Sequence, residues 1–150
     1  MGAIRLEIPS DRYAVDLAET LALGVARLHQ MPDSHIDDFG LAVRESVINA
    51  IVHGNQDVST RRVSVEFVLA TPDVERRLVT TVCDEGYGFD WEDVPDPLAP
   101  ENLLKPTGRG LLFIRAFTDD LSVRRVPAGG TVVRFTNRLN PPRQPSAEQG

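Results

Sequence analysis

The sequence has very little of two residue types on which many functional sites depend, cysteine and lysine. Cys83 is its one cysteine, which excludes an internal disulfide and a cysteine-rich metal site. Lys105 is its one lysine, and arginine carries the remaining positive charge. Because arginine does not lose its proton in proteins, covalent catalysis by an amine side chain has no candidate other than Lys105.

Long apolar runs are also missing. No segment reaches the roughly 20 apolar residues that cross a bilayer, and the N-terminus lacks the apolar core of a signal peptide. The net charge is −6 and the pI is about 5.0, which counts against direct binding to nucleic acid. Together these absences predict a soluble, cytoplasmic protein with neither a membrane nor a nucleic acid as its partner.

What the chain does have is enough apolar material for one core. Its 150 residues, of which 41% are hydrophobic, are typical of a single domain. The last stretch, 140–150, contains three prolines in a polar setting and no hydrophobic periodicity. We therefore expect one domain over residues 1–139, followed by a disordered tail over 140–150.

Alternating apolar residues and turn residues predict the order of the elements. We expect strands at 4–8, 62–70, 76–83, 121–126 and 131–137, and helices at about 11–30, 34–54 and 109–117. Short turns between neighbouring strands favour a mostly antiparallel or mixed sheet, with the helices on one face. The fold class is therefore α/β (α+β), a two-layer sandwich.

Three local signals suggest where the first two helices begin and end. Ser10 or Asp11 is expected to cap the first helix. Ser34 with Asp37 resembles a capping box at the start of the second helix. Gly54 and the asparagine after it are typical of a helix C-terminus. Arginine pairs at 61–62, 76–77 and 124–125 flank strands and are interpreted as solvated edge charges.

A polar line runs along the second predicted helix. Glu45, Asn49 and His53 stand four residues apart, so a helix places them on one face, one above another. The surrounding segment is largely apolar, and one stripe of it consists of Ile36, Phe39, Val43, Val47 and Ala50. Because buried polar groups are costly without partners, we expect the line to face a cavity that holds a polar ligand or a metal ion. For His53, a capping or packing role is an equally simple interpretation.

Two glycine-containing segments accompany this helix. In the first, Asp84 to Phe89 (DEGYGF), a carboxylate at a strand end and two glycines suit a flat ligand that carries an amino group. In the second, Thr107 to Leu111 (TGRGL), the glycines stand where a helix begins, and helix starts attract phosphates. A plain turn and a plain loop are the alternatives. Neither segment fits the P-loop, the dinucleotide fingerprint or the ordinary protein-kinase signature.

Taken in order, these motifs resemble those of the GHKL ATPase superfamily. The segment 45–55 (ESVINAIVHGN) resembles its N box, and 84–89 and 108–111 resemble its two glycine boxes. Gly130 to Val133 is similar to its closing strand. The order and spacing agree over residues 35–137, which implies the Bergerat ATP-binding fold. Within the superfamily, the chain most resembles the anti-sigma-factor serine/threonine kinases of bacterial partner switching.

The resemblance implies a role for individual residues. It makes Glu45 the catalytic carboxylate, Asn49 the ligand of Mg²⁺, and Asp84 the reader of the adenine amino group. Between the glycine boxes, residues 90–107 would form a lid over ATP. The further positions that it assigns to nucleotide binding are His53, Gly86, Gly88, Phe89, Thr107, Gly108, Arg109, Gly110, Leu111 and Thr131.

The function that the resemblance implies is phosphoryl transfer from ATP, with Mg²⁺, to a serine or threonine of a small anti-anti-sigma protein of the STAS type. The kinase would also bind a sigma factor, and a homodimer through the N-terminal strand and helix is expected. Two alternatives stay open. One is an ATP-binding regulatory module without kinase activity, and the other is a catalytic domain of the histidine-kinase type.

Overall fold

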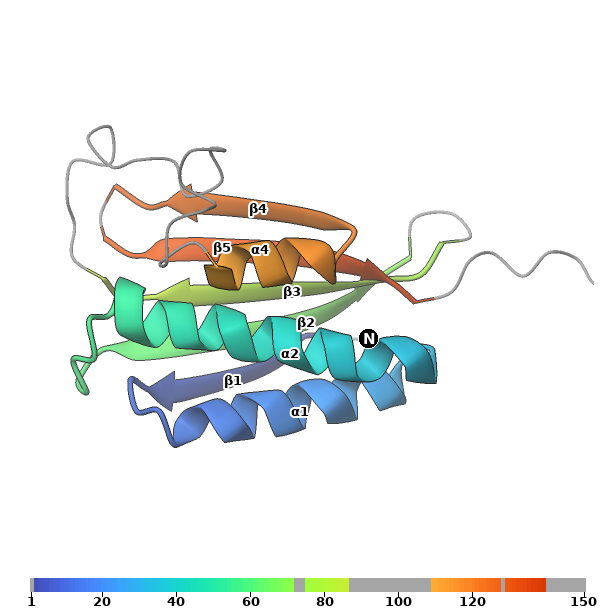
Figure 1. Cartoon of the computed structure of the whole chain (residues 1–150), viewed down its shortest axis with the longest axis horizontal. Coiled ribbons are helices and arrows are strands. Elements are labelled where there is room, and N and C mark those ends of the chain that lie inside the picture. Colours follow the sequence, from blue (N-terminus) through green and yellow to red (C-terminus); the bar gives the residue numbers. More distant parts are fainter. Residues whose placement is uncertain (1, 72–74, 87–108, 128, 140–150) are drawn as a thin grey trace, which may run out of the picture.

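The structure is a computed structural model that describes residues 2–71, 75–86, 109–127 and 129–139. In these residues five strands, three α-helices and one π-helical turn follow one another (Figure 1). Their bounds, in chain order, are β1 (Ile4–Pro9), α1 (Ala14–Leu28), α2 (Asp33–Asn49), η1 (Ala50–Gly54), β2 (Arg62–Ala70), β3 (Arg77–Asp84), α4 (Arg109–Ala116), β4 (Asp120–Arg125) and β5 (Thr131–Arg138).

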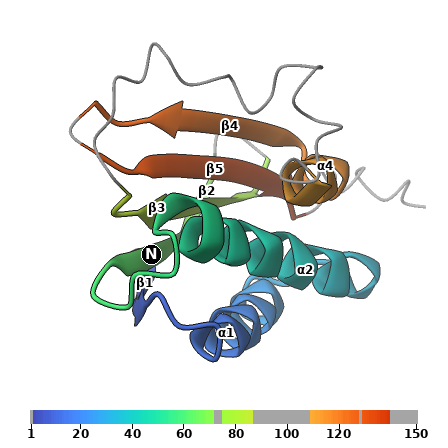
Figure 2. The ribbon, with the colours of Figure 1, turned by 60° about the vertical axis from the view of Figure 1, so that its left-hand side comes forward.

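The five strands form one sheet in the order β1-β2-β3-β5-β4, and every pair of neighbours is antiparallel. The three α-helices lie on one face of this sheet (Figures 1 and 2). The predicted two-layer α/β class, with a mostly antiparallel sheet, is therefore confirmed. Because β5 inserts between β3 and β4, the end of β3 lies beside the beginning of β5.

The core forms where the apolar stripe of α2 meets the inward face of the sheet. Alternate residues of β2, namely Val63, Val65 and Phe67, are buried, as the period of a strand requires. The five residues of the predicted α2 stripe are all buried as well. Phe39 lies at the centre of this core, with its ring centroid 6.1 Å from that of Phe67 and 6.3 Å from that of Phe135.

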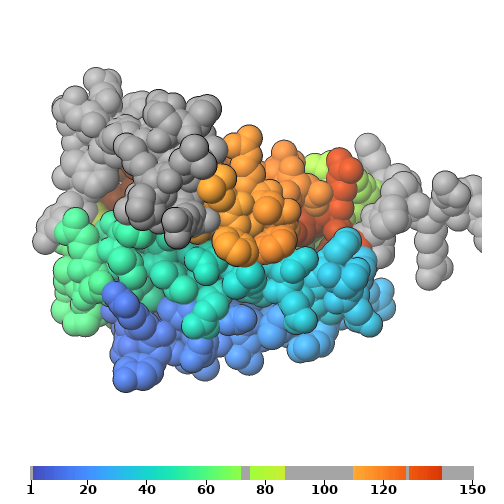
Figure 3. Space-filling view, in the orientation of Figure 1, coloured from blue at the N-terminus to red at the C-terminus, as the bar shows by residue number. Residues whose placement is uncertain are grey.

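Helix α2 is the central helix of its layer. Helix α1 packs on one side of it and α4 on the other, and the space-filling view shows α2 between the two (Figure 3). This position explains why α2 has a second, half-buried apolar side, formed by Leu41, Ile48 and Val52. In the described part of the chain, no helix is both long and apolar enough to cross a membrane.

The predicted N-caps of the first two helices are only partly right. The Asp11 carboxylate accepts a 2.9 Å hydrogen bond from the N–H of Tyr13 in the turn that leads into α1, but neither Ser10 nor Ser34 caps a helix. Helix α1 begins at Ala14, and the buried hydroxyl of Ser10 instead donates a 2.7 Å hydrogen bond to the Arg61 carbonyl. Helix α2 begins at Asp33 without a side-chain cap, so Ser34 already lies inside its first turn. Pro32 explains this early start, because its φ of −54° and ψ of 135° turn an extended chain directly into a helix.

The second helix ends near the predicted glycine, but by a different geometry. Its last turn, η1, is π-helical, and the N–H of Asn55 donates to the carbonyl of Ala50 over 2.7 Å. The left-handed residues are Gln56 and Asp57, with φ of 53° and 58°, not the expected cap. Single π-turns are frequent at functional sites, and this one contains His53. The division into a domain and a tail stays a prediction, since 140–150 lie outside the described residues.

The Phe39 cluster gives a test of the core. We expect Phe39→Ala to lower the free energy of unfolding by about 3–5 kcal/mol, because it removes both ring contacts and leaves a cavity. Urea denaturation measures this loss. The control is Tyr13→Ala, since Tyr13 is 87% exposed and its removal should change stability by less than about 0.5 kcal/mol. Equal losses for the two variants would contradict the proposed packing.

Candidate functional site

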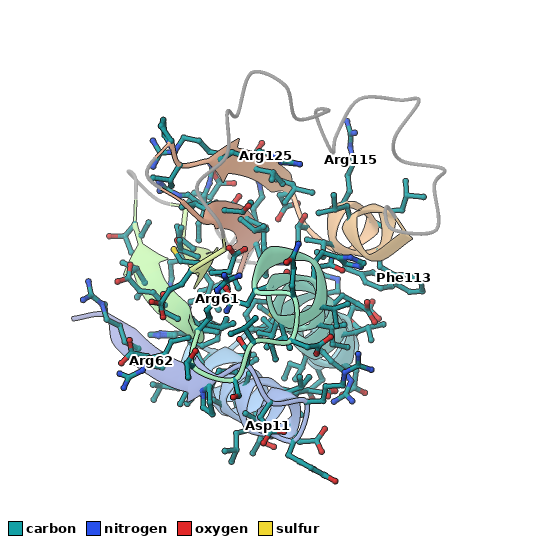
Figure 4. The ribbon with its side chains drawn as sticks, turned by 90° about the vertical axis from the view of Figure 1, so that its left-hand side faces the viewer. Asp11, Arg61, Arg62, Phe113, Arg115 and Arg125 are labelled. Atoms are coloured by element: carbon teal, nitrogen blue, oxygen red, sulfur yellow. The ribbon has the colours of Figure 1, made fainter. Side chains whose placement is uncertain are left out.

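A cavity of about 270 Å³ opens at one end of the molecule, where η1, the end of β3, the first turns of α4 and the β4–β5 connection meet. Figure 4 views the molecule from this end, with Arg125 at the end of β4 and Arg61 just before β2. The lining residues come from segments far apart in the sequence: Asn49, Ala50, His53, Gly54, Asp84, Gly86, Leu111, Val123, Arg125, Gly130, Thr131 and Val133.

Asp84, the last residue of β3, supplies the carboxylate of the cavity. Its Oδ1 accepts hydrogen bonds from the backbone N–H groups of Gly86, at 3.0 Å, and Thr131, at 3.1 Å. These two hydrogen bonds both go to Oδ1. Burial raises the pKa of Asp84 above its ordinary value, while the two N–H groups and the guanidinium groups of Arg125 and Arg61 oppose that rise.

The Asp84 side chain fits because three glycines surround it. A Cβ at Gly54 would collide with the Asp84 carboxylate, and a Cβ at Gly130 would collide with its backbone carbonyl oxygen. Gly86 lies equally close to Gly54, since a Cβ there would stand 2.5 Å from the Gly54 carbonyl oxygen. Gly130 also has φ of +93°, which other residues rarely adopt. On the side of these glycines the carboxylate is thus surrounded by backbone.

Asn49 lies at the other side of the cavity, against the first turn of α4. A Cβ at Gly110 would stand 2.7 Å from Asn49 Nδ2, so the lack of a side chain at Gly110 lets the two helices meet here. In the described part of the chain the Asn49 amide makes no hydrogen bond to another side chain or backbone group. Its oxygen therefore remains available to a ligand beside the start of α4, where unpaired N–H groups attract anions.

The predicted polar line divides in the structure. Asn49 and His53 line the cavity, although His53 is largely exposed. Glu45 is half-buried one turn earlier in α2 and does not line the cavity. Its sequence neighbour Arg44 turns to the opposite side, where its guanidinium binds Asp16 at 2.6 Å and Glu19 at 2.8 Å. The Glu45 carboxylate is therefore not neutralised by Arg44.

Most of the other predicted site residues that can be placed come together here. Gly86, Leu111 and Thr131 line the cavity with Asp84, and Gly110 contacts Asn49. Arg109 is the first residue of α4, and the position of its side chain is not described. The whole of the predicted lid 90–107 lies outside the described residues, and so do the predicted site residues Gly88, Phe89, Thr107 and Gly108.

Several lining residues were not predicted. Gly54 was interpreted as a helix end, and its contact with Asp84 was not predicted. The one feature of the sequence that pointed to the site was its position directly after His53. Gly130 was interpreted as part of a closing strand. Its position next to Thr131, a predicted site residue, could have identified it as a residue of the site. Arg125 was interpreted as an edge charge, and that interpretation is wrong because it lines the cavity. The apolar contributions of Val123 and Val133 follow from strand alternation alone.

The geometry suits a ligand with two unlike ends. Near Asp84, a hydrogen-bond acceptor faces a space with apolar side chains at Leu111, Val123 and Val133, which suits a flat ring that bears an amino group. Near Asn49, an amide oxygen and the start of a helix suit an anionic group with a bound cation. Both ends belong to one continuous cavity.

Comparisons with known proteins agree with this geometry. The sequence model of the histidine kinase-like ATPase domain matches residues 8–137. The anti-sigma F factor of Bacillus subtilis is 31% identical over 125 residues, which are 81% of this chain and 81% of the relative. The serine-protein kinase RsbW of Bacillus velezensis is 29% identical over 143 residues, which are 91% of this chain and 86% of the relative.

A solved structure has the same fold. The crystal structure of the RsbU and RsbW domains of a Mycobacterium tuberculosis protein superimposes with a TM-score of 0.67 and 22% identity. The match covers 94% of this chain and 34% of that one, so this chain spans about a third of that protein. From the family match over residues 8–137, this chain belongs to the family of histidine kinase-like ATPase domains.

Proposed function

We propose that this chain is an ATP-dependent serine/threonine protein kinase that also acts as an anti-sigma factor. Its substrate would be a small anti-anti-sigma protein of the STAS type, and its second partner a sigma factor. The observation that carries the proposal is the single cavity with the Asp84 carboxylate at one side and Asn49 beside the start of α4 at the other. The names of the two bacterial relatives support the choice of partners.

ATP fits the cavity in one direction. The adenine amino group would donate to the Asp84 carboxylate, and the base would lie against Leu111, Val123 and Val133. Thr131 would contribute at the same end, where its N–H already holds Asp84. The phosphates would then lie towards Asn49 and the first turn of α4. Gly110 and Leu111, in the first turn of α4, would border them.

A divalent cation fits beside Asn49. Mg²⁺ keeps several waters and takes one or two protein ligands together with phosphate oxygens, so one amide oxygen is sufficient. In the part of the chain that the structure describes, no three carboxylate, imidazole or thiol groups gather into a metal-ligand set. Asn49 would be the protein ligand of an ion that is otherwise held by the nucleotide, and such an ion supplies charge neutralisation to phosphates.

Glu45 would act as the general base. It lies one turn before Asn49 in α2 and outside the cavity lining. Its carboxylate would accept the proton of the incoming serine or threonine while Asn49 and the α4 start hold the phosphate end. A homodimer through β1 and α1 is also proposed, because Leu17 and Leu28 are exposed on α1. Light scattering of the purified chain tests that assembly.

Radiolabelled ATP with Mg²⁺ and a purified STAS-type antagonist tests the function. We expect label on a serine or threonine of the antagonist, and we expect Glu45→Gln to slow this transfer by about 10²- to 10⁴-fold while ATP binds with unchanged affinity. Glutamine keeps the size of the side chain but cannot take the proton. Normal transfer by the variant would remove Glu45 as the base. ATP binding without transfer by the wild-type chain would favour the regulatory alternative, and label on histidine would favour the histidine-kinase type.

Asp84→Asn tests the proposed adenine contact. The Asn oxygen can still accept from Gly86 and Thr131, but its NH₂ group would then face the adenine amino group, donor against donor. We expect ATP to bind about 10- to 100-fold more weakly by calorimetry. Unchanged affinity would exclude Asp84 from the site.

The same variant has a pH dependence with a definite sign. Because burial raises the pKa of Asp84, folding disfavours its charged form. This cost is fully present above the raised pKa, decreases as the pH falls through it, and is absent below the ordinary pKa of the unfolded chain. Asp84→Asn removes the cost, so at pH 7 the free variant should melt at the same or a higher temperature than the wild type. The ratio of wild-type to variant ATP affinity should shrink as the pH falls towards the Asp84 pKa, and titration of the phosphates cancels in that ratio.

Gly110→Ala tests the contact between α4 and Asn49. The added Cβ would stand 2.7 Å from Asn49 Nδ2 and would displace the amide, so Mg²⁺·ATP should bind about tenfold more weakly or worse. The matched control is Gly24→Ala in α1, where an added Cβ meets nothing within 4 Å. That variant should keep its ATP affinity and gain about 0.5–1 kcal/mol of stability. Equal ATP affinity for the two variants would contradict the proposed placement of the phosphates.

A further inference from the structure

The most completely partnered polar side chain beside the nucleotide cavity is that of Asn55, which is fully buried directly after η1. Its Nδ2 donates to Ser10 Oγ at 2.8 Å and to the Arg62 carbonyl at 3.0 Å. Its Oδ1 accepts the N–H of Glu85 at 2.8 Å. An amide with all three bonds made cannot rotate, so each partner is held in a defined place.

The three partners belong to different segments that meet at the end of the molecule seen in Figure 4. Ser10 follows β1, Arg62 begins β2, and Glu85 follows β3. The backbone of Asn55 is fixed in turn, because its N–H donates to the Ala50 carbonyl at 2.7 Å and its carbonyl accepts from Arg61 Nη1 at 3.4 Å. One side chain thus joins the end of the central helix to three strands.

The hydrogen bond from the Glu85 N–H to Asn55 is the one that lies next to the Asp84 carboxylate. This N–H belongs to the peptide group that connects Asp84 to Glu85, so Asn55 holds the N–H side of this peptide plane. Gly130 packs against the carbonyl oxygen on the opposite side of the same plane. A second bond, from the N–H of Arg62 to Glu85 Oε1 at 2.6 Å, ties the next side chain down. The peptide next to the Asp84 carboxylate is clamped from both sides.

We propose that Asn55 is a positioning residue of the nucleotide site, which orients the Asp84 carboxylate by holding the Asp84–Glu85 peptide. The proposal rests on the proposed function only in naming ATP as the ligand. The Asn55 amide would not contact the nucleotide and would act only through Asp84. The hydrogen bond that Oδ1 accepts from the Glu85 N–H orients the peptide, whereas the two hydrogen bonds that Nδ2 donates hold Asn55 in place.

The test compares three variants of the full chain. Asn55→Ala removes the Glu85 bond, and Ser10→Ala removes one partner of Nδ2 but keeps the Glu85 bond. Val25→Ala enlarges a buried site in α1 that does not line the cavity, so it lowers stability alone. Calorimetry below the melting temperature of every variant should show about tenfold weaker ATP binding for Asn55→Ala, and less than about twofold change for the other two. In the transfer assay Asn55→Ala should raise KM for ATP and leave kcat at saturating ATP unchanged.

Amide hydrogen exchange gives a readout that needs no nucleotide. In the wild-type chain the Glu85 N–H should exchange as slowly as the buried amides of β3, and it should exchange fast in Asn55→Ala but not in Ser10→Ala. Fast exchange of Glu85 in the wild type would overturn the proposal even if Asn55→Ala does not fold. Equal ATP affinity of Asn55→Ala and Ser10→Ala would also overturn it. Failure of the wild type to bind ATP would instead refute the proposed function, and the exchange rates would still decide whether Asn55 holds the peptide.

Discussion

The site depends on one half-buried carboxylate, that of Asp84, whose charged form is favoured by backbone N–H groups and by two guanidinium groups. Burial raises the pKa of Asp84, and the N–H groups of Gly86 and Thr131 oppose that rise together with the guanidinium groups of Arg125 and Arg61. Glycine at 54 and 130 gives the group its space, because any side chain there would displace it. The carboxylate therefore stands ready as an acceptor before any ligand arrives. The remaining elements of the fold can be understood as the means of assembling this arrangement.

Strand order accomplishes much of the assembly. Because β5 pairs with β3 antiparallel, with Cys83 opposite Val132, the start of β5 lies beside the end of β3, and Thr131 reaches Asp84. The central position of α2 between α1 and α4 then brings Asn49 to the first turn of α4. Residues separated by 47 positions in the sequence thus share a hydrogen bond. Few of these contacts depend on local structure, and a shift in strand register would separate them.

Local patterns were enough to predict the strands, the apolar stripe of α2 and the α/β class, because periodicity reports directly which face is buried. The helix ends were not predictable in the same way: Pro32 set the start of α2, and the π-turn at 50–54 depends on bonds to distant segments through Asn55. Gly54 and Gly130 resembled ordinary cap and turn glycines, since their contact with Asp84 exists only in the folded chain. The order of the motifs identified the segments that form the site, but the contacts between these segments could be seen only in the tertiary structure.

The separation of Glu45 from the cavity has a consequence for the proposed reaction. The groups that would hold ATP line one enclosed space, while the proposed base lies one turn earlier in α2 and outside that lining. Binding of the nucleotide and removal of the hydroxyl proton would therefore use different residues. Such a base can accept a proton only after a protein hydroxyl has docked, so it cannot accelerate phosphoryl transfer before then. The bound triphosphate would thereby be protected from premature reaction. Under this arrangement the fit of the acceptor protein around Glu45, more than the affinity for ATP, would determine which protein is phosphorylated.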